Sequence, residues 1–259
     1  MSSPFRHLRI TRDGAVATVA LDRPPVNAVN LEVIDEFLRV VSEIGSDMSI
    51  RAVILTGSGR AFCAGADIAM MRDLSVENHR RVRRWVDVQA ALEAMPKPVI
   101  AAIQGYALGG GAELTLACDV RFMADEAEIG FPEIELGLFP GAGGTQRLTR
   151  LLGPARALQL MMEGRRLTGH EAKALGLVDR LLPGAALLSA VHAYARDIAG
   201  KPTRAIGLLK RCVYGGIGRP LDAALELEAA AVFEVIETAD AREGLTAFLE
   251  KRPPRFRGR

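Results

Sequence analysis

Cysteine is scarce in this sequence, and its few copies stand apart. Cys63, Cys118 and Cys212 are an odd number, with no C-x-x-C or Cys/His spacing among them. A chain of 259 residues, 49% of them hydrophobic, has enough apolar side chains for a buried core without cross-links. The sequence therefore argues against a disulfide framework and against a structural zinc site.

An excess of charge of one sign is also missing. The chain has 33 basic and 31 acidic side chains, a formal net charge of +2, which gives no global attraction to nucleic acid or anionic lipid. No apolar run approaches the ~18 residues of a membrane span. The longest runs, residues 99–103 and 185–191, have the size of core segments. We therefore expect a soluble chain that binds no membrane.

Targeting signals are faint or absent. Arg6, Arg9 and Arg12 precede the first acid, Asp13, which weakly resembles a transit peptide. A strand pattern begins almost at once, however, and leaves no room for a removable segment. The last three residues are not a peroxisomal address. We expect the protein in the cytoplasm.

Up to about Thr145 the sequence alternates short β-branched runs with helical patterns, which is typical of an α/β fold. The predicted strands are residues 15–21, 52–56, 99–103 and 118–123. The predicted helices between them are residues 31–44 and 79–94. Asn30 is the expected N-cap of the first helix, and Pro96 and Pro98 end the second.

After Thr145 the strand signals fade and the sequence predicts consecutive helices. They are residues 145–152, 154–162, 169–175, 187–199, 203–213, 221–236 and 240–250. A helical portion added to an α/β core often serves subunit contacts, so we expect a core over residues 1–197 that carries the site and an oligomer-forming region over residues 198–259. Residues 225–236 are apolar around most of a helix, which predicts burial on more than one side.

The 26 glycines indicate where a ligand binds, because many of them cluster in loops that lead into helices. The clusters are Gly57 with Gly59, Gly65, Gly105 with residues 109–111, and Gly141 with Gly143 and Gly144. Glycine lets a backbone approach a ligand closely and direct N–H groups at it, although for any one cluster taken alone a tight turn is the better explanation. The dinucleotide fingerprint and the Walker A sequence both fail, and no G-x-S-x-G or H-E-x-x-H sequence occurs.

Two glutamates stand among apolar neighbours beside these glycines. Glu113 is expected in the first turn of an apolar helix, and Glu133 lies in an apolar loop. Either alone can be a helix-dipole partner or a cap. Held together in a dry pocket, the two can bind a water and divide acid and base roles. Other glutamates nearby lack such a setting and are expected to be solvated or ion-paired: Glu126, Glu128 and Glu135.

Four stretches resemble the crotonase superfamily in order and spacing, and within it most resemble the enoyl-CoA hydratases. They are residues 23–30 (RPPVNAVN), 60–68 (RAFCAGADI), 104–114 (QGYALGGGAEL) and 132–148 (PEIELGLFPGAGGTQRL). Residues 248–253 (FLEKRP) also resemble the family's C-terminal signature. The likeness covers nearly the whole chain. It implies a crotonase-type spiral of ββα units, followed by helices that build trimers, commonly stacked as hexamers.

The resemblance implies a site as well. The backbone N–H groups of Ala66 and Gly110 would form an oxyanion hole for an acyl-CoA thioester oxygen. Glu113 would orient and deprotonate a water, and Glu133 would deliver a proton to the α carbon. The implied reaction is reversible syn addition of water across a trans-2-enoyl-CoA, giving a 3-hydroxyacyl-CoA. No cofactor and no metal are implied, because coenzyme A is part of the substrate.

The resemblance further implies contacts to the two ends of the substrate. The CoA-binding positions are Arg23, Ala28, Ala64, Asp67, Ile68, Phe248 and Lys251. The last two positions can reach the CoA of a neighbouring subunit in a homotrimer or a dimer of trimers. The candidate walls of the acyl pocket are Met70, Met71, Trp85, Leu138, Phe139 and Gly141. Residues 69–71 depart from the charged continuation usual in hydratases, which leaves the acyl-chain length open.

Three other interpretations stay open. A Δ3-Δ2-enoyl-CoA isomerase shares the fold but needs one base, so the glutamate pair favours the hydratase. A nucleic-acid-binding role would rest on a row of arginines, which equally suits a solvated helix face or a CoA-phosphate contact: Arg80, Arg81, Arg83 and Arg84. Only Trp85 accompanies that row for base stacking. A CoA-binding protein without catalysis is disfavoured by the intact glutamate pair.

Overall fold

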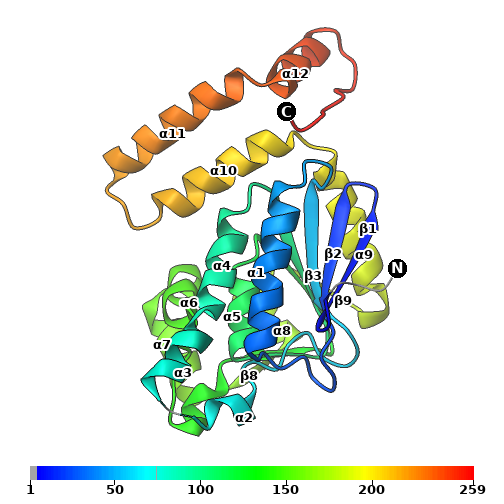
Figure 1. The fold of residues 1–259 in the computed structure, drawn as a ribbon. Coiled ribbons are helices and arrows are strands. Elements are labelled where there is room, and N and C mark those ends of the chain that lie inside the picture. The colour runs from blue at the N-terminus through cyan, green and yellow to red at the C-terminus, as the bar shows by residue number, and fades with distance from the viewer. Residues whose placement is uncertain (1–4, 74) are drawn as a thin grey trace.

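A computed structural model describes residues 5–73 and 75–259, and its main layer is a six-stranded sheet (Figure 1). In spatial order the strands are β1 (Leu8–Asp13), β2 (Val16–Leu21), β3 (Ala52–Gly57), β4 (Val99–Ile103), β6 (Val120–Ala124) and β9 (Arg180–Leu182). β1 runs antiparallel to β2, and all other neighbours are parallel. Every residue of β3 and β4 is buried, as the apolar runs of a sheet covered on both faces require.

A second, three-stranded sheet carries the loops of the site. It contains β5 (Tyr106–Leu108), β7 (Glu128–Gly130) and β8 (Arg166–Thr168). β4 and then β6 each feed one short strand of this sheet before the chain turns into helices. Successive turns therefore place one strand in each sheet, which is the spiral of ββα units that the resemblance implies.

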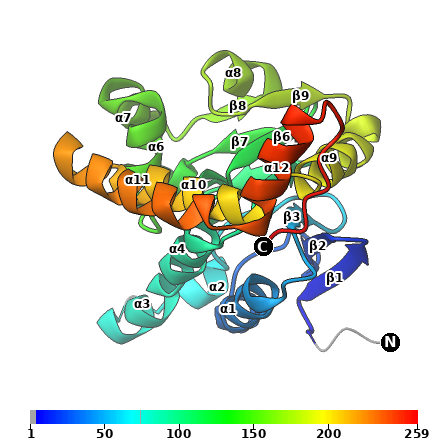
Figure 2. The same cartoon turned by 90° about the horizontal axis from the view of Figure 1, so that it is seen from above.

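Helices cover both faces of the large sheet (Figure 2). α1 (Leu31–Ser46) begins at the expected N-cap, where Asn30 Oδ1 accepts a hydrogen bond from Val33 N at 2.9 Å. Its apolar stripe, which includes Ile34 and Phe37, is buried. α9 (Gly184–Ala199) packs on β2, β3, β4 and β6 from the other side. The helical spacing in the sequence predicts both helices correctly.

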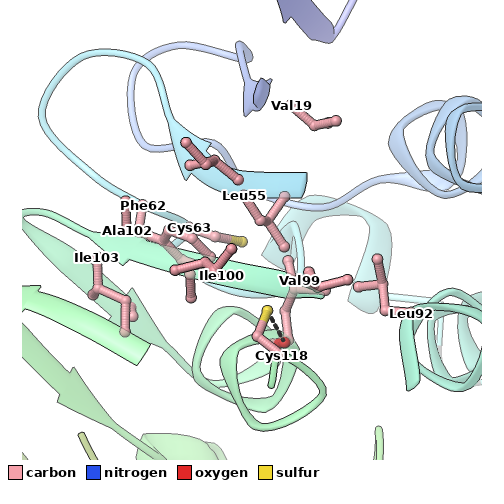
Figure 3. Close-up of a cluster of buried hydrophobic side chains, with 14 of the residues drawn as sticks. Val19, Leu55, Phe62, Cys63, Leu92, Val99, Ile100, Ala102, Ile103 and Cys118 are labelled. Atoms are coloured by element: carbon pink, nitrogen blue, oxygen red, sulfur yellow. Dashed lines mark hydrogen bonds between the residues drawn. The ribbon is translucent and has the colours of Figure 1, made fainter. Parts of the chain in front are cut away.

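Two of the cysteines belong to the core between these layers (Figure 3). Cys63 and Cys118 are free thiols, 0% and 1% exposed. Burial raises the pKa of each thiol to about 12, so neither is a nucleophile near neutral pH. Both cysteines therefore act as packing residues of the core.

The stretch predicted as one helix over residues 79–94 is two helices. They are α3 (Val76–Arg83) and α4 (Trp85–Ala94), with a break at Arg84. A short helix, α2 (Ile68–Met71), precedes them. α4 must turn Trp85 into the core, where it is 3% exposed and meets Phe37 edge-on at 5.5 Å between ring centroids. α3, by contrast, buries only Asn78. The break at Arg84 therefore separates a helix packed on the core, α4, from a largely exposed one, α3.

The expectation of helices alone after Thr145 is wrong at β8 and β9. Each has three residues, too few for the period-two alternation that indicates a strand. The helices of the second half of the fold are α5 (Gly110–Leu116), the 3-10 helix η1 (Pro132–Leu136), α6 (Gly144–Leu152), α7 (Pro154–Glu163), α8 (Gly169–Ala174), α10 (Thr203–Gly216), α11 (Leu221–Ile236) and α12 (Ala239–Leu249).

α10, α11 and α12 form an arm at one end of the molecule, opposite α2 (Figure 1). The prediction that α11 is buried on more than one side is wrong for a single chain. Of its residues only Ala231 is buried, whereas Val232 and Phe233 are 48% and 67% exposed. The physical reason is that within one chain α11 makes its main contacts with α10 and α12, which leave much of its surface open. The division at residues 197 and 198 falls in the last turn of α9 and stays a prediction.

Candidate active site

Two backbone N–H groups meet where β5 leads into α5. Gly110 is the first residue of α5, and a Cβ built on it would lie 3.8 Å from the nitrogen of Ala66. Neither N–H donates a hydrogen bond to any group in the described ranges 5–73 and 75–259. Two free N–H groups this close, one of them at a helix N-terminus, suit an oxygen that gains negative charge.

Close backbone packing builds this hole and excludes side chains from it. Gly65 has φ +92°, and a Cβ on it would lie 3.2 Å from the Gly110 nitrogen. A Cβ on Gly111 would overlap the carbonyl oxygen of Cys63. Trp85 closes one side, where its Nε1 donates to the Gly110 carbonyl at 3.0 Å. The glycine clusters thus serve the close approach that the sequence predicts.

Glu113 lies in the first turn of α5, as predicted, and is 2% exposed. Its Oε1 accepts hydrogen bonds from the N–H groups of Ala142 and Gly144, both at 2.8 Å. Burial raises the pKa of Glu113, while these N–H groups and the nearby Arg147 charge lower it. The carboxylate is therefore held by one oxygen in a dry setting.

Glu133 lies on η1 and borders the same hole. A Cβ on Gly109, the residue before the hole's Gly110, would lie 3.0 Å from Glu133 Oε1. Glu133 Oε2 is buried and has no hydrogen-bond partner among the described residues. Burial raises the pKa of Glu133 to about 7, and the charge of Glu113 adds to the rise. A carboxyl group with such a pKa can exchange a proton near neutral pH.

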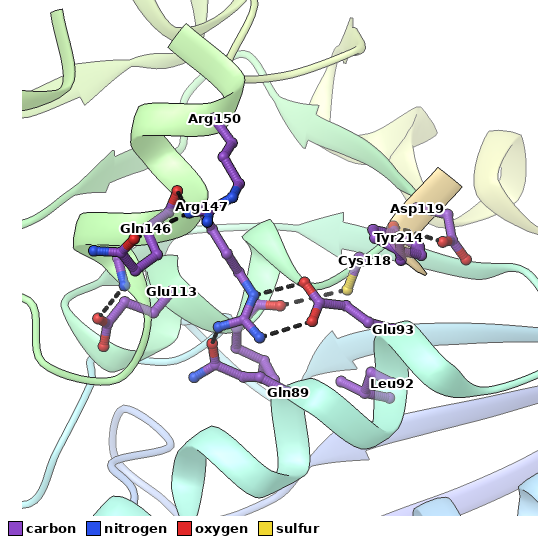
Figure 4. A network of polar contacts seen from close by, with 12 residues as sticks. Gln89, Leu92, Glu93, Glu113, Cys118, Asp119, Gln146, Arg147, Arg150 and Tyr214 are labelled. Atoms are coloured by element: carbon purple, nitrogen blue, oxygen red, sulfur yellow. Dashed lines mark hydrogen bonds and ion pairs between the residues drawn. The ribbon is translucent and has the colours of Figure 1, made fainter. Parts of the chain in front are cut away.

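Three polar side chains near Glu113 have no role in the sequence interpretation (Figure 4). Arg147, on α6, donates from Nε and Nη2 to the two carboxylate oxygens of Glu93 at 2.6 and 2.8 Å, and from Nη1 to Gln89 Oε1 at 3.0 Å. Gln89 and Glu93 are four residues apart on α4 and share a face with Trp85. That spacing is visible in the sequence, but nothing there pairs these residues with Arg147.

The candidate CoA residues before and around α2 are brought together. Arg23 donates from Nη2 to Asp67 Oδ2 at 2.6 Å and from Nη1 to the Ala28 carbonyl at 3.0 Å. Asp67 Oδ1 also caps α2 by accepting from Ala69 N at 3.0 Å. The Arg23 guanidinium is thus ion-paired, and a phosphate would share it with Asp67. Ala64 is half-buried nearby in the chain and Ile68 is 58% exposed.

Phe248 and Lys251 are not brought to this place. Phe248, on α12, is 82% exposed, and Lys251 follows the end of that helix with φ +54°. Figure 1 places α12 at the opposite end of the molecule from α2. Within one chain these residues cannot join the candidate CoA site.

The candidate acyl-pocket residues come from three elements. Met70 and Met71 are half-buried on α2, and Trp85 is buried at the start of α4. The others lie between η1 and α6, where Leu138 is half-buried, Phe139 is 69% exposed and Gly141 is exposed. Of these, the contacts above join only Trp85 to the oxyanion hole. The remaining walls stay predictions.

Known proteins are similar to this chain over nearly its whole length. Residues 11–259 match the family model described as enoyl-CoA hydratase/isomerase. The chain belongs to this family. Crotonyl-CoA hydratase of Syntrophomonas wolfei is 39% identical over 255 residues, which cover 97% of this chain and 98% of the relative. Short-chain-enoyl-CoA hydratase of Clostridium acetobutylicum is 38% identical over 246 residues, 94% of each chain.

Solved structures of the family share the fold. The crystal structure of an enoyl-CoA hydratase from Bacillus anthracis matches 98% of this chain with a TM-score of 0.93 and 39% identity, over 100% of its own length. An enoyl-CoA hydratase structure from Geobacillus kaustophilus has a TM-score of 0.96 at 35% identity, covering 99% and 98% of the two chains. These findings confirm the resemblance, the crotonase-type fold and the expected enzyme class, enoyl-CoA hydratase. No helix among the described residues is long and apolar enough to cross a membrane.

Proposed function

We propose that this chain catalyses the reversible syn addition of water to trans-2-enoyl-CoA thioesters. The observation that carries the proposal is the arrangement around Gly110. Two unpaired N–H groups lie side by side there, and two carboxyl groups whose pKa is raised by burial, Glu113 and Glu133, border them. The N–H groups of Ala66 and Gly110 would hold the thioester oxygen, and removing one such donor typically costs ~3 kcal/mol of barrier.

The two glutamates would divide the proton transfers. Glu113 takes a proton from water as the water oxygen bonds to the β carbon, and the C=C electron pair moves to the thioester oxygen as an enolate. Glu133 then gives its proton to the α carbon, and exchange with solvent restores both groups. The pKa of about 7 supports a Glu133 that carries a proton near neutral pH. The paired N–H bonds on Glu113 support a fixed base, because they hold its carboxyl group in place and partly offset the rise in its pKa that burial causes.

Several copies of the chain would form the working enzyme, as a trimer or a dimer of trimers. The exposed apolar side chains of α11 support this part of the proposal. The distance of Phe248 and Lys251 from α2 also supports it, because these residues can contact CoA only in another copy. An acyl-CoA thioester is the proposed partner, with no metal or separate cofactor. Nucleic acid is not part of the proposal.

Crotonyl-CoA tests the reaction directly, because hydration removes the conjugated thioester absorbance. We expect turnover by the wild-type chain and a loss of at least about a hundredfold in Glu113→Gln and Glu133→Gln, since each carries a proton transfer worth 10²–10⁴-fold. No turnover by the wild type, or a Glu113→Gln variant with unchanged rate, would overturn the proposal. Supplying a 3-enoyl-CoA instead measures the isomerase alternative, which predicts that one of the two variants keeps full activity.

A further inference from the structure

We propose that Arg147 is a positioning residue, which clamps α6 onto α4 and thereby holds the N–H groups of Ala142 and Gly144 against Glu113. The inference rests on the proposed function, because it takes Glu113 as the catalytic base. Arg147 does not touch Glu113 by any hydrogen bond among the described residues, so its action passes through the backbone of residues 142–144.

The clamp is a forked ion pair with a fixed direction. The Arg147 guanidinium meets both oxygens of Glu93, at 2.6 and 2.8 Å, with side chains only 15% and 23% exposed. Its remaining nitrogen donates to Gln89 Oε1 at 3.0 Å. Gln89 is 0% exposed, and Arg147 satisfies its buried Oε1, whereas its Nε2 has no partner among the described residues. Such a bidentate arrangement fixes both distance and orientation.

The clamp acts on the loop that binds Glu113. Arg147 N donates to the Gly143 carbonyl at 2.8 Å, and a Cβ on Gly143 would overlap Arg147 Nη1. Gly143 has φ +106°, a conformation that favours glycine. The guanidinium therefore lies directly against the loop. The loop's other side meets Glu113 Oε1 through Ala142 N and Gly144 N.

Charge adds a second effect with a definite sign. The charged groups around Glu113 are Arg147 from α6 and Glu133 from η1, while Glu93 from α4 pairs with Arg147. Arg147 lowers the pKa of Glu113, so its removal raises that pKa. Because a base works only when deprotonated, the acidic limb of the rate profile then moves to higher pH.

The test compares Arg147→Gln with Arg150→Gln. Arg150 lies one turn further on α6, is exposed and, among the residues the structure describes, hydrogen-bonds only Gln146, so this control makes the same charge change on the same helix. With crotonyl-CoA, we expect Arg147→Gln to lose about 10²-fold in kcat with KM nearly unchanged, since a 1 Å misplacement can cost that much. The acidic limb moves to higher pH. Arg150→Gln keeps the wild-type kcat and limb.

Arg147→Lys separates charge from geometry. Lysine keeps the charge but cannot form the fork, so we expect it to restore the acidic limb and only a part of kcat. Glu93→Gln offers a second route if Arg147→Gln folds poorly, because it weakens the clamp and leaves Arg147 in place. An Arg147→Gln variant that matches Arg150→Gln in kcat and in pH profile would overturn the proposal.

Hydrogen exchange gives a readout that does not depend on turnover. We expect the amides of residues 142–144 to exchange faster in Arg147→Gln and Glu93→Gln than in Arg150→Gln, because the loop loses its support. If the wild type fails to hydrate crotonyl-CoA, the proposed function is overturned, while hydrogen exchange still tests whether Arg147 supports the loop. Unchanged exchange in both variants would overturn the positioning role even in an active hydratase.

Discussion

Gly144 approaches Glu113 so closely that a Cβ on it would lie 2.8 Å from Oε1, the oxygen that its own N–H also binds at 2.8 Å. The same Cβ would lie 2.7 Å from Pro140 Cβ, so it has no alternative space. We expect Gly144→Ala to push the Glu113 carboxylate out of line and to lower kcat for hydration by about 10²-fold. Steady-state kinetics with crotonyl-CoA measure this loss in kcat.

Gly45 provides the matched control for this substitution. It lies in α1, and a Cβ on it would meet nothing within 4 Å. Gly45→Ala is expected to keep wild-type kinetics and not to lower the free energy of unfolding, because Gly45 lies in the last turn of α1 and alanine favours a helical backbone more than glycine does. Equal kcat values for Gly144→Ala and Gly45→Ala would contradict the interpretation of Glu113.

Glu133 predicts a pH limb that hydration and dehydration share. Burial raises the pKa of Glu133 to about 7, and hydration needs its protonated form. The kcat/KM for hydration should therefore fall as pH rises through about 7. Dehydration of a 3-hydroxyacyl-CoA starts with that one proton on Glu113 instead, and because the overall reaction consumes no net proton, its kcat/KM should show the same limb. These midpoints belong to the coupled carboxyl pair.

Glu133→Gln tests this assignment, since glutamine neither gives nor takes the proton. The residual activity of this variant should lack the limb near pH 7 in both directions. Recording circular dichroism with the rates from pH 5 to 9 on the same preparations separates this limb from one due to unfolding, which would also change the circular dichroism. A limb that persists in Glu133→Gln would assign the titration to another group.

The local fold follows from the sequence where a period is long enough to be seen. The 16 residues of α1 repeat their apolar stripe over several turns, and Asn30 marks the start. β8 and β9 have three residues each and exist because β7 and β6 offer free edges, which is information about partners far away in the chain. α11 shows the opposite error, because its apolar surface predicts contacts that one chain does not supply.

In the site, too, some residues can be predicted from the sequence and others cannot. The apolar surroundings of Glu113 and Glu133, together with the family resemblance, predict these two side chains, and the resemblance alone predicts which backbone N–H groups form the hole. Arg147 lies within the matched stretch 132–148, yet its partners Glu93 and Gln89 come from a helix more than 50 positions earlier. Such long-range pairing depends on how α4 and α6 pack, and no local pattern encodes it.

The exposed apolar side chains of the arm predict its role in assembly. Phe233 on α11 is 67% exposed, more than an isolated chain usually leaves on a large aromatic ring. Phe233→Asp should place a charge in the subunit contact and lower the mass measured by light scattering. Met48, 74% exposed after α1, is the control, and Met48→Asp should keep the wild-type mass. A wild-type chain that is already monomeric would contradict the assembly.

The buried contacts of Lys210, on α10, attach the arm to the core. Its Nζ donates to Asp119 Oδ2 at 2.7 Å and to the Lys97 carbonyl at 2.9 Å, and Tyr214 Oη donates to Asp119 Oδ1 at 2.8 Å. The ion-paired side chains are 8% and 16% exposed. Lys210→Met leaves Asp119 nearly buried without its cation, which should cost about 3–5 kcal/mol of unfolding free energy.

Urea unfolding at fixed protein concentration measures this cost, with Lys201→Met as the control. Lys201 pairs with Asp197 at 3.5 Å, but these side chains are 52% and 65% exposed, so its loss should cost no more than about 1 kcal/mol. Replacing Asp119 by Asn as well as Lys210 by Met removes both charges and should recover part of the stability lost in the single variant, because no unpaired charge remains. If Lys210→Met and Lys201→Met unfold at the same urea concentration, the buried pair does not anchor the arm.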